Sequence, residues 1–105
     1  MKILFDQGVP RPLRRYLAGH LINTTAERGW STLENGVLLD RAEEDGYQLL
    51  ITTDQSLRHQ QNFAGRKIAI LVLLSTAWPL IQLRVKEIQA AVNGMTPGDY
   101  KEISI

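Results

Sequence analysis

The hydrophobic and polar positions of the chain follow two alternating patterns. Short apolar or β-branched runs are typical of strands, and they lie at 2–5, 20–24, 48–52 and 67–73. Residues spaced three and four apart with apolar side chains are typical of helices, and they lie at 10–18, 35–45 and 79–93. A short helix is expected after Asp54, and the period-two pattern of 100–105 predicts a final edge strand.

This alternation predicts the fold class. Strands that alternate with helices form a mainly parallel sheet covered by helices on both faces, so we expect a three-layer α/β/α architecture with four to five strands. A chain of 105 residues is long enough for one domain with a hydrophobic core, but not for two such domains. The whole chain, 1–105, is therefore expected to be a single domain.

Composition excludes several classes of protein. The net charge is +1 and there is no cysteine, which excludes a disulfide scaffold, a thiolate metal site and a cysteine nucleophile. The longest apolar stretch, 68–74, is far shorter than the roughly 20 residues that span a bilayer. We expect a protein of the cytoplasm that makes no membrane contact.

Two of the predicted strands run directly into an aspartate, Asp6 after the first and Asp54 after the third. Ligands of parallel α/β sheets bind beyond the carboxyl ends of the strands, so both carboxylates are expected at that edge. Two acids at one edge repel each other unless a cation joins them, and Mg²⁺ or Mn²⁺ prefers carboxylate oxygens. The alternative is that each aspartate only caps a turn or helix by accepting backbone N–H groups.

Other charged residues have ordinary as well as functional interpretations. A basic group, formed by Arg11, Arg14, Arg15 and Arg58, lies on the helices that follow the two aspartates. These side chains could bind the phosphates of a nucleic acid, or they could be ordinary surface arginines. The acidic residues of the second long helix are expected to form a solvated face; they are Asp40, Glu43, Glu44 and Asp45.

Several motifs, in order along the whole chain, resemble the PIN-like family, in particular its compact bacterial members that carry a domain of unknown function. The motifs are Phe5-Asp6-Gln7-Gly8-Val9-Pro10, Leu13-Arg14-Arg15, Asn35-Gly36-x-Leu38-Leu39 with Ala42, Leu50-Ile51-Thr52-Thr53-Asp54-Gln55-x-Leu57 and the apolar strand 68–74. The resemblance implies a Rossmann-like fold with strand order 3-2-1-4 and the fifth strand beside the fourth. It also implies a ribonuclease that depends on Mg²⁺ or Mn²⁺.

The resemblance assigns expected roles to individual residues. Asp6 and Asp54 would hold the cation, and Asn35 or Glu34 would position the attacking water. Where relatives carry further acids, this chain offers Asn35 at the second helix and Ser75 with Thr76 after the fourth strand. Two acids therefore replace a quartet, which weakens the expected metal site. Among the basic group, Arg14 or Arg58 would bind substrate phosphate, and Ser75 would also line the substrate site.

The resemblance implies the toxin component of a bacterial toxin–antitoxin module. RNA would be the substrate and a small DNA-binding antitoxin, encoded nearby, the partner. Self-association as a homodimer is compatible with this interpretation. The alternative is a catalytically weak PIN-like module that acts through protein–protein binding.

Overall fold

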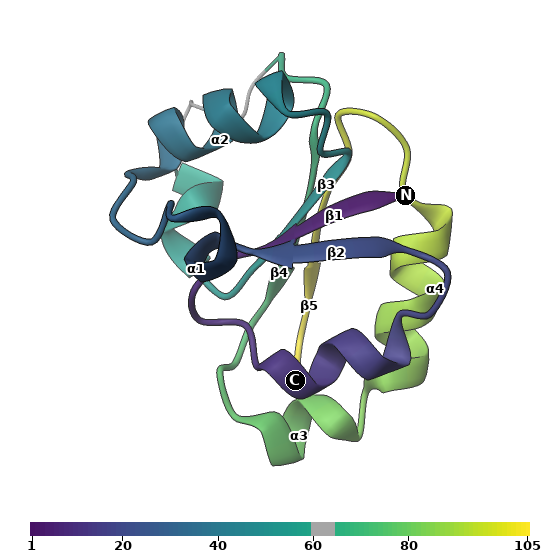
Figure 1. Cartoon of the computed structure of the whole chain (residues 1–105). Coiled ribbons are helices and arrows are strands. Elements are labelled where there is room, and N and C mark those ends of the chain that lie inside the picture. The colour runs from purple at the N-terminus through teal and green to yellow at the C-terminus, as the bar shows by residue number, and fades with distance from the viewer. Residues whose placement is uncertain (60–64) are drawn as a thin grey trace.

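The structure is a computed structural model that describes residues 1–59 and 65–105. Five strands form one sheet in which every neighbouring pair is parallel (Figure 1). The strands are β1 (Lys2–Phe5), β2 (Leu21–Thr24), β3 (Leu49–Thr52), β4 (Ala69–Leu73) and β5 (Tyr100–Ile103). The predicted parallel α/β architecture is confirmed.

The predicted strand order is wrong. The observed order is β2-β1-β3-β4-β5, so β3 lies between β1 and β4 instead of outside β2. The physical reason is burial on two faces: all four residues of β3 are buried, as a central parallel strand requires. In β2 only Thr24 is buried and Leu21 is 60% exposed, which suits an edge strand.

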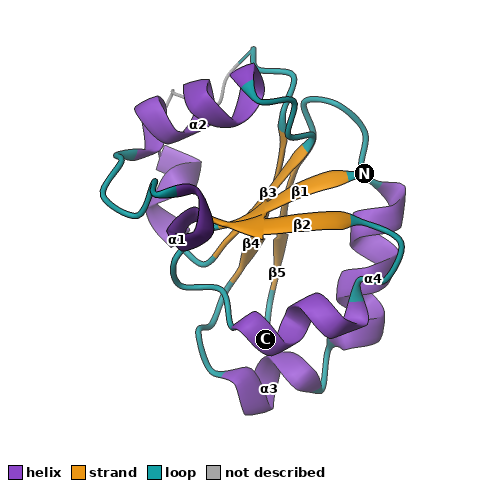
Figure 2. Cartoon of the chain, viewed as in Figure 1, coloured by secondary structure: helices purple, strands orange, loops and turns teal. Residues whose placement is uncertain are grey.

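Two layers of helices cover the sheet (Figure 2). The helices are η1 (Arg11–Tyr16), α1 (Thr25–Arg28), α2 (Asn35–Glu44), η2 (Gln55–His59), α3 (Trp78–Gln82) and α4 (Val85–Gly94), where η denotes a 3₁₀ helix. The helix predicted at 79–93 is thus divided into α3 and α4, and the helix predicted at 10–18 is a shorter 3₁₀ helix. The short helix expected after Asp54 is η2.

Each face of the sheet has its own core. On one face, strand residues such as Phe5 and Ile51 pack with Leu13 and Leu17 of η1 and its following turn, and with Ile88 of α4. On the other face, which we call the α2 face, a second set of strand residues packs with α2 and η2; the set comprises Leu4, Leu50, Ile70 and Val72. Burying each such side chain contributes roughly 1.5–3 kcal/mol to folding.

No helix in the described part of the chain has the length and apolar character needed to cross a membrane.

Candidate functional site

Asp6 and Asp54 lie at the same carboxyl edge of the sheet, as predicted, and one buried hydroxyl connects them. Thr52, the last residue of β3, has no exposed surface. Its Oγ1 donates to Asp6 Oδ2 at 2.8 Å and accepts the backbone N–H of Asp54 at 3.1 Å. This hydroxyl fixes one carboxylate directly and the backbone of the other.

Sequence reasoning missed Thr52 as a member of the site. Asp6 is two residues after Leu4, and Thr52 is two residues after Leu50, so both side chains belong to the α2 face. The register pairs Phe5 with Ile51, which places Asp6 beside Thr52. Asp6 and Thr52 come into contact only because β1 and β3 are adjacent strands. The local sequence pattern does not reveal which strands are adjacent.

The Asp54 carboxylate is held on both oxygens. Its Oδ1 accepts hydrogen bonds from Ser56 Oγ at 2.6 Å and from Ser56 N at 3.0 Å, and its Oδ2 accepts one from Asn35 Nδ2 at 2.8 Å. The Ser56 hydroxyl and then the Asn35 amide lower the pKa of Asp54 below its usual value. Asp54 therefore caps η2 and is also joined to the start of α2.

Both aspartates do accept hydrogen bonds from nearby backbone N–H groups, as the capping alternative expects. Asp6 Oδ1 accepts the Gln7 backbone N–H at 2.8 Å, so both aspartates satisfy local backbone donors. A carboxylate oxygen has two lone pairs, and both oxygens of Asp6 and Oδ2 of Asp54 accept a single hydrogen bond each from the described residues. Capping and cation binding are therefore compatible.

The donor set at this edge is too small for two metal ions. Asp6 and Asp54 supply carboxylate oxygens of the kind that Mg²⁺ and Mn²⁺ prefer, with water completing the coordination. Among residues 1–59 and 65–105 there is no group of three or more acidic, histidine or cysteine side chains placed to hold a metal ion. The described side chains therefore offer too few ligands for a site with two metal ions.

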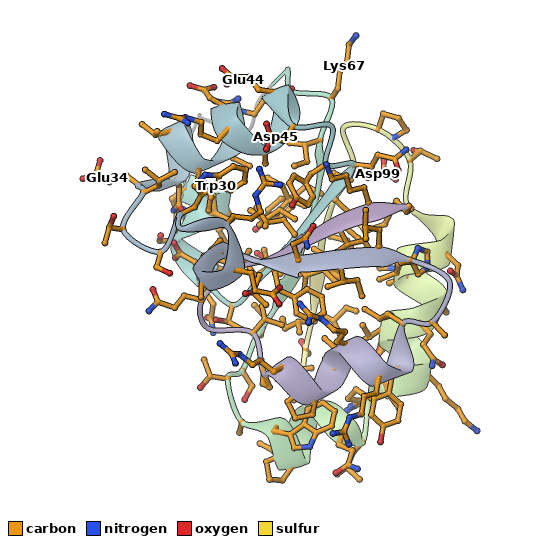
Figure 3. The ribbon with its side chains drawn as sticks, viewed as in Figure 1. Trp30, Glu34, Glu44, Asp45, Lys67 and Asp99 are labelled. Atoms are coloured by element: carbon orange, nitrogen blue, oxygen red, sulfur yellow. The ribbon has the colours of Figure 1, made fainter. Side chains whose placement is uncertain are left out.

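Of the secondary candidates, only Asn35 joins the pair of aspartates. Glu34 is exposed and projects outward from the start of α2 (Figure 3); its side chain makes no capping hydrogen bond. Ser75 Oγ accepts the backbone N–H of Ala77 at 3.0 Å, just before α3. The structure therefore gives Ser75 a local capping contact.

The loops that follow β1, β3 and β4 meet beside the site. A Cβ added at Gly8 would lie 2.1 Å from Thr53 Oγ1 and 3.8 Å from Thr76 Cγ2. Only glycine allows this approach without a shift of Thr53. The carboxyl edge is thus tightly packed, which restricts the positions of both aspartates.

The four candidate arginines differ in their surroundings. Arg14 forms two hydrogen bonds to the Glu27 carboxylate, at 2.5 Å and 3.3 Å; this contact lowers the pKa of Glu27 to about 2. Among the described residues Arg58 has one loose ion pair, 3.9 Å from Nη1 to Glu102 Oε1, and its Nε donates to His59 Nε2 at 3.2 Å. Arg11 and Arg15 are exposed and have no ion-pair partner in the described part of the chain.

The acidic group of α2 is only partly solvated, which corrects the expectation for it. Arg66 pairs with Asp40 at 2.7 Å and with Glu43 at 2.8 Å, and Arg28 pairs with Asp45. Glu44 is exposed, in agreement with the prediction. Arg66 therefore anchors α2 to the segment that precedes β4.

A cavity of about 260 Å³ lies elsewhere, at the amino-terminal end of the sheet. Its lining includes Met1, Tyr47, Ile68, Met95 and Pro97. This lining is mainly apolar and holds no pair of carboxylates comparable to Asp6 and Asp54. We therefore place the candidate site at the opposite, carboxyl edge.

Comparisons of the chain with protein-family models, with curated proteins and with solved structures gave no match.

Proposed function

We propose that the protein is a metal-dependent ribonuclease of PIN-like type that hydrolyses RNA phosphodiester bonds at the Asp6–Asp54 edge. The observation that carries the proposal is the Thr52 hydroxyl, which joins Asp6 and the backbone of Asp54 at 2.8 Å and 3.1 Å. A buried hydroxyl in this place holds two acids together at the edge where parallel α/β folds bind ligands.

Each side chain has a defined task in this proposal. Asp6 and Asp54 would hold a single Mg²⁺ or Mn²⁺, which would polarise a phosphoryl oxygen and lower the pKa of water. Asn35, whose amide donates to Asp54 Oδ2 at 2.8 Å, fixes that carboxylate and would help to position the attacking water. Thr52 holds Asp6 in place.

The toxin role in a bacterial toxin–antitoxin module is part of the same proposal. It rests on the resemblance of the motifs around Asp6 and Asp54 to PIN-like proteins. A small DNA-binding protein encoded next to this chain would be the antitoxin. Co-purification of the two products from a common transcript is the expected outcome.

A second function is favoured by one specific observation. In the described chain both carboxylates make capping hydrogen bonds, and no third acid joins them. A catalytically weak module that acts by protein–protein binding would have these features. It would bind the neighbouring gene product without cutting RNA.

RNA cleavage distinguishes the two functions. Purified protein with Mn²⁺ should cleave single-stranded RNA slowly, and Asp6→Ala should remove the activity. Asn35→Asp should raise both metal affinity and cleavage, because it adds a third carboxylate beside Asp54. If neither the wild type nor Asn35→Asp cuts RNA while the protein still binds its genetic neighbour, the binding function is correct.

A further inference from the structure

A second polar cluster lies on η2 and β5, outside the pair of aspartates. It consists of Arg58 near the end of η2 and of Tyr100 and Glu102 on β5. The Tyr100 hydroxyl donates to Glu102 Oε2 at 2.8 Å, and Arg58 Nη1 lies 3.9 Å from Glu102 Oε1. We call these three residues the β5 cluster.

Strand register places the β5 cluster on the same face as the aspartates. Thr52 pairs with Val72, and Val72 pairs with Glu102. Paired residues of parallel strands point to the same side of a sheet, and Val72 belongs to the core of the α2 face. Glu102 therefore lies two strands from Thr52, roughly 10 Å along the same edge.

The electrostatics agree with this placement. Burial and then the Glu102 carboxylate raise the pKa of Tyr100 to about 12. The positive charge of Arg58 lowers this pKa, and the negative charge of Asp54 raises it. Tyr100 therefore keeps its proton at neutral pH and continues to donate to Glu102. Since Asp54 also caps η2 through Ser56, the helix that carries Arg58 is fixed to the candidate metal site.

The arginines of η1 are less suited to a substrate bound at this edge. Leu13 of η1 and Leu17 after it are buried in the core of the opposite face, so η1 packs on that face. Arg14 already donates two hydrogen bonds to the Glu27 carboxylate. Arg58 keeps half of its side chain exposed, and among the described acids it has one loose ion pair, to Glu102. Its Nε donates to the neighbouring His59 Nε2 at 3.2 Å, which leaves its two Nη groups able to donate to a phosphate.

We propose that a single-stranded RNA bound at the Asp6–Asp54 edge passes over η2 and β5, with Arg58 binding a backbone phosphate and Glu102 acting as a positioning residue for Arg58. This inference rests on the proposed function, which it deepens by naming the surface that holds the substrate. Tyr100 fixes Glu102, and Glu102 in turn limits where the Arg58 guanidinium lies.

Binding of a fluorescent single-stranded RNA, measured without divalent cation over a series of salt concentrations, tests the path. Arg58→Gln should weaken binding and reduce the slope of log affinity against log salt by about one. Arg84→Gln is the matched control, since Arg84 precedes α4 and is likewise about half exposed with a loose ion pair, 3.8 Å from Nη1 to Glu87 Oε2; it should leave the slope unchanged. An unchanged slope in Arg58→Gln, whatever the slope in Arg84→Gln, would overturn the path.

The role of Glu102 is tested by comparing cleavage with binding. Glu102→Gln keeps an oxygen that can accept a hydrogen bond from the Tyr100 hydroxyl, but it loses the negative charge that forms the ion pair with Arg58. The cleavage rate with Mn²⁺ should fall while RNA affinity stays equal or rises, because one negative charge is removed. Tyr100→Phe should change both in the same direction and by less, and Glu102→Asp should restore part of the rate.

If Glu102 has only a structural role, Glu102→Gln should lower the melting temperature and leave the cleavage rate unchanged below that temperature; this outcome overturns the positioning role.

The proposed nuclease function and the proposed RNA surface fail in different ways. Wild type that binds RNA through Arg58 but never cleaves it contradicts the nuclease and supports this surface. Wild type that cleaves RNA, with an unchanged salt slope in Arg58→Gln, contradicts this surface and supports the nuclease.

Discussion

At the scale of single residues, the site depends on one buried hydroxyl between two acids. Asp6 and Asp54 could be predicted because each ends an apolar run. The contact of Thr52 with them and the position of Glu102 on the same face could not be predicted, because both depend on which strands are adjacent. Asn35 was expected to position water at the site, and the structure shows its amide donating to Asp54 Oδ2. Glu34, its neighbour in sequence, points outward because α2 begins between the two residues.

The hydroxyl of Thr52 should contribute more to the free energy of unfolding than its methyl group does. Thr52→Val removes the donor to Asp6 and leaves the Asp54 backbone N–H without its acceptor. We expect a loss of about 1–3 kcal/mol in the free energy of unfolding, measured by urea denaturation. Thr52→Ser keeps the hydroxyl and should lose only about 1 kcal/mol for the buried methyl. Equal losses in the two variants would mean that the hydroxyl contributes little.

At the scale of elements, propensity predicted which segments form strands but not their order. The apolar pattern located β1, β3 and β4, yet a local pattern does not say which strands are neighbours. The helix α1 was not predicted because it has only four residues. Its signal is the capping box, in which Thr24 Oγ1 accepts the Glu27 N–H and Glu27 accepts the Thr24 N–H.

The loops after β1 and β3 give a prediction at this scale. Gly8→Ala places a Cβ 2.1 Å from Thr53 Oγ1, so the Thr53 side chain or the loop must move. We expect a destabilisation of about 1–3 kcal/mol by thermal unfolding. Thr53→Ala removes the clashing oxygen, so adding it to Gly8→Ala should recover part of the loss. Additive effects of the two substitutions would contradict a direct clash.

At the scale of the whole molecule, the carboxylates determine how stability changes with pH. The pKa of Glu27 falls from 4.5 to about 2, chiefly through the hydrogen bond from Arg14, and hydrogen bonds also lower the pKa values of Asp54 and Asp99. Groups with a lowered pKa in the folded state stabilise it above their unfolded pKa, and this contribution is lost as the pH falls through the folded pKa.

The free energy of unfolding should therefore be nearly constant from about pH 7 to about pH 5 and should decrease steadily toward about pH 2. Urea midpoints measured across this range would show the decrease. Glu27→Gln keeps an oxygen for the capping box but cannot titrate, so its midpoint should depend less on pH below about pH 5. An identical pH dependence in Glu27→Gln would show that Glu27 has an ordinary pKa in the folded protein.

A melting-temperature titration with Mn²⁺ tests whether one divalent cation binds between Asp6 and Asp54. A cation that binds only the folded state raises the melting temperature. Asp54→Asn should abolish the rise. Asp99→Asn is the matched control, because Asp99 is a capping aspartate with a lowered pKa outside the site; it should respond as the wild type does. If Asp54→Asn and Asp99→Asn both keep the full wild-type rise, the cation binds elsewhere and the proposed site is wrong.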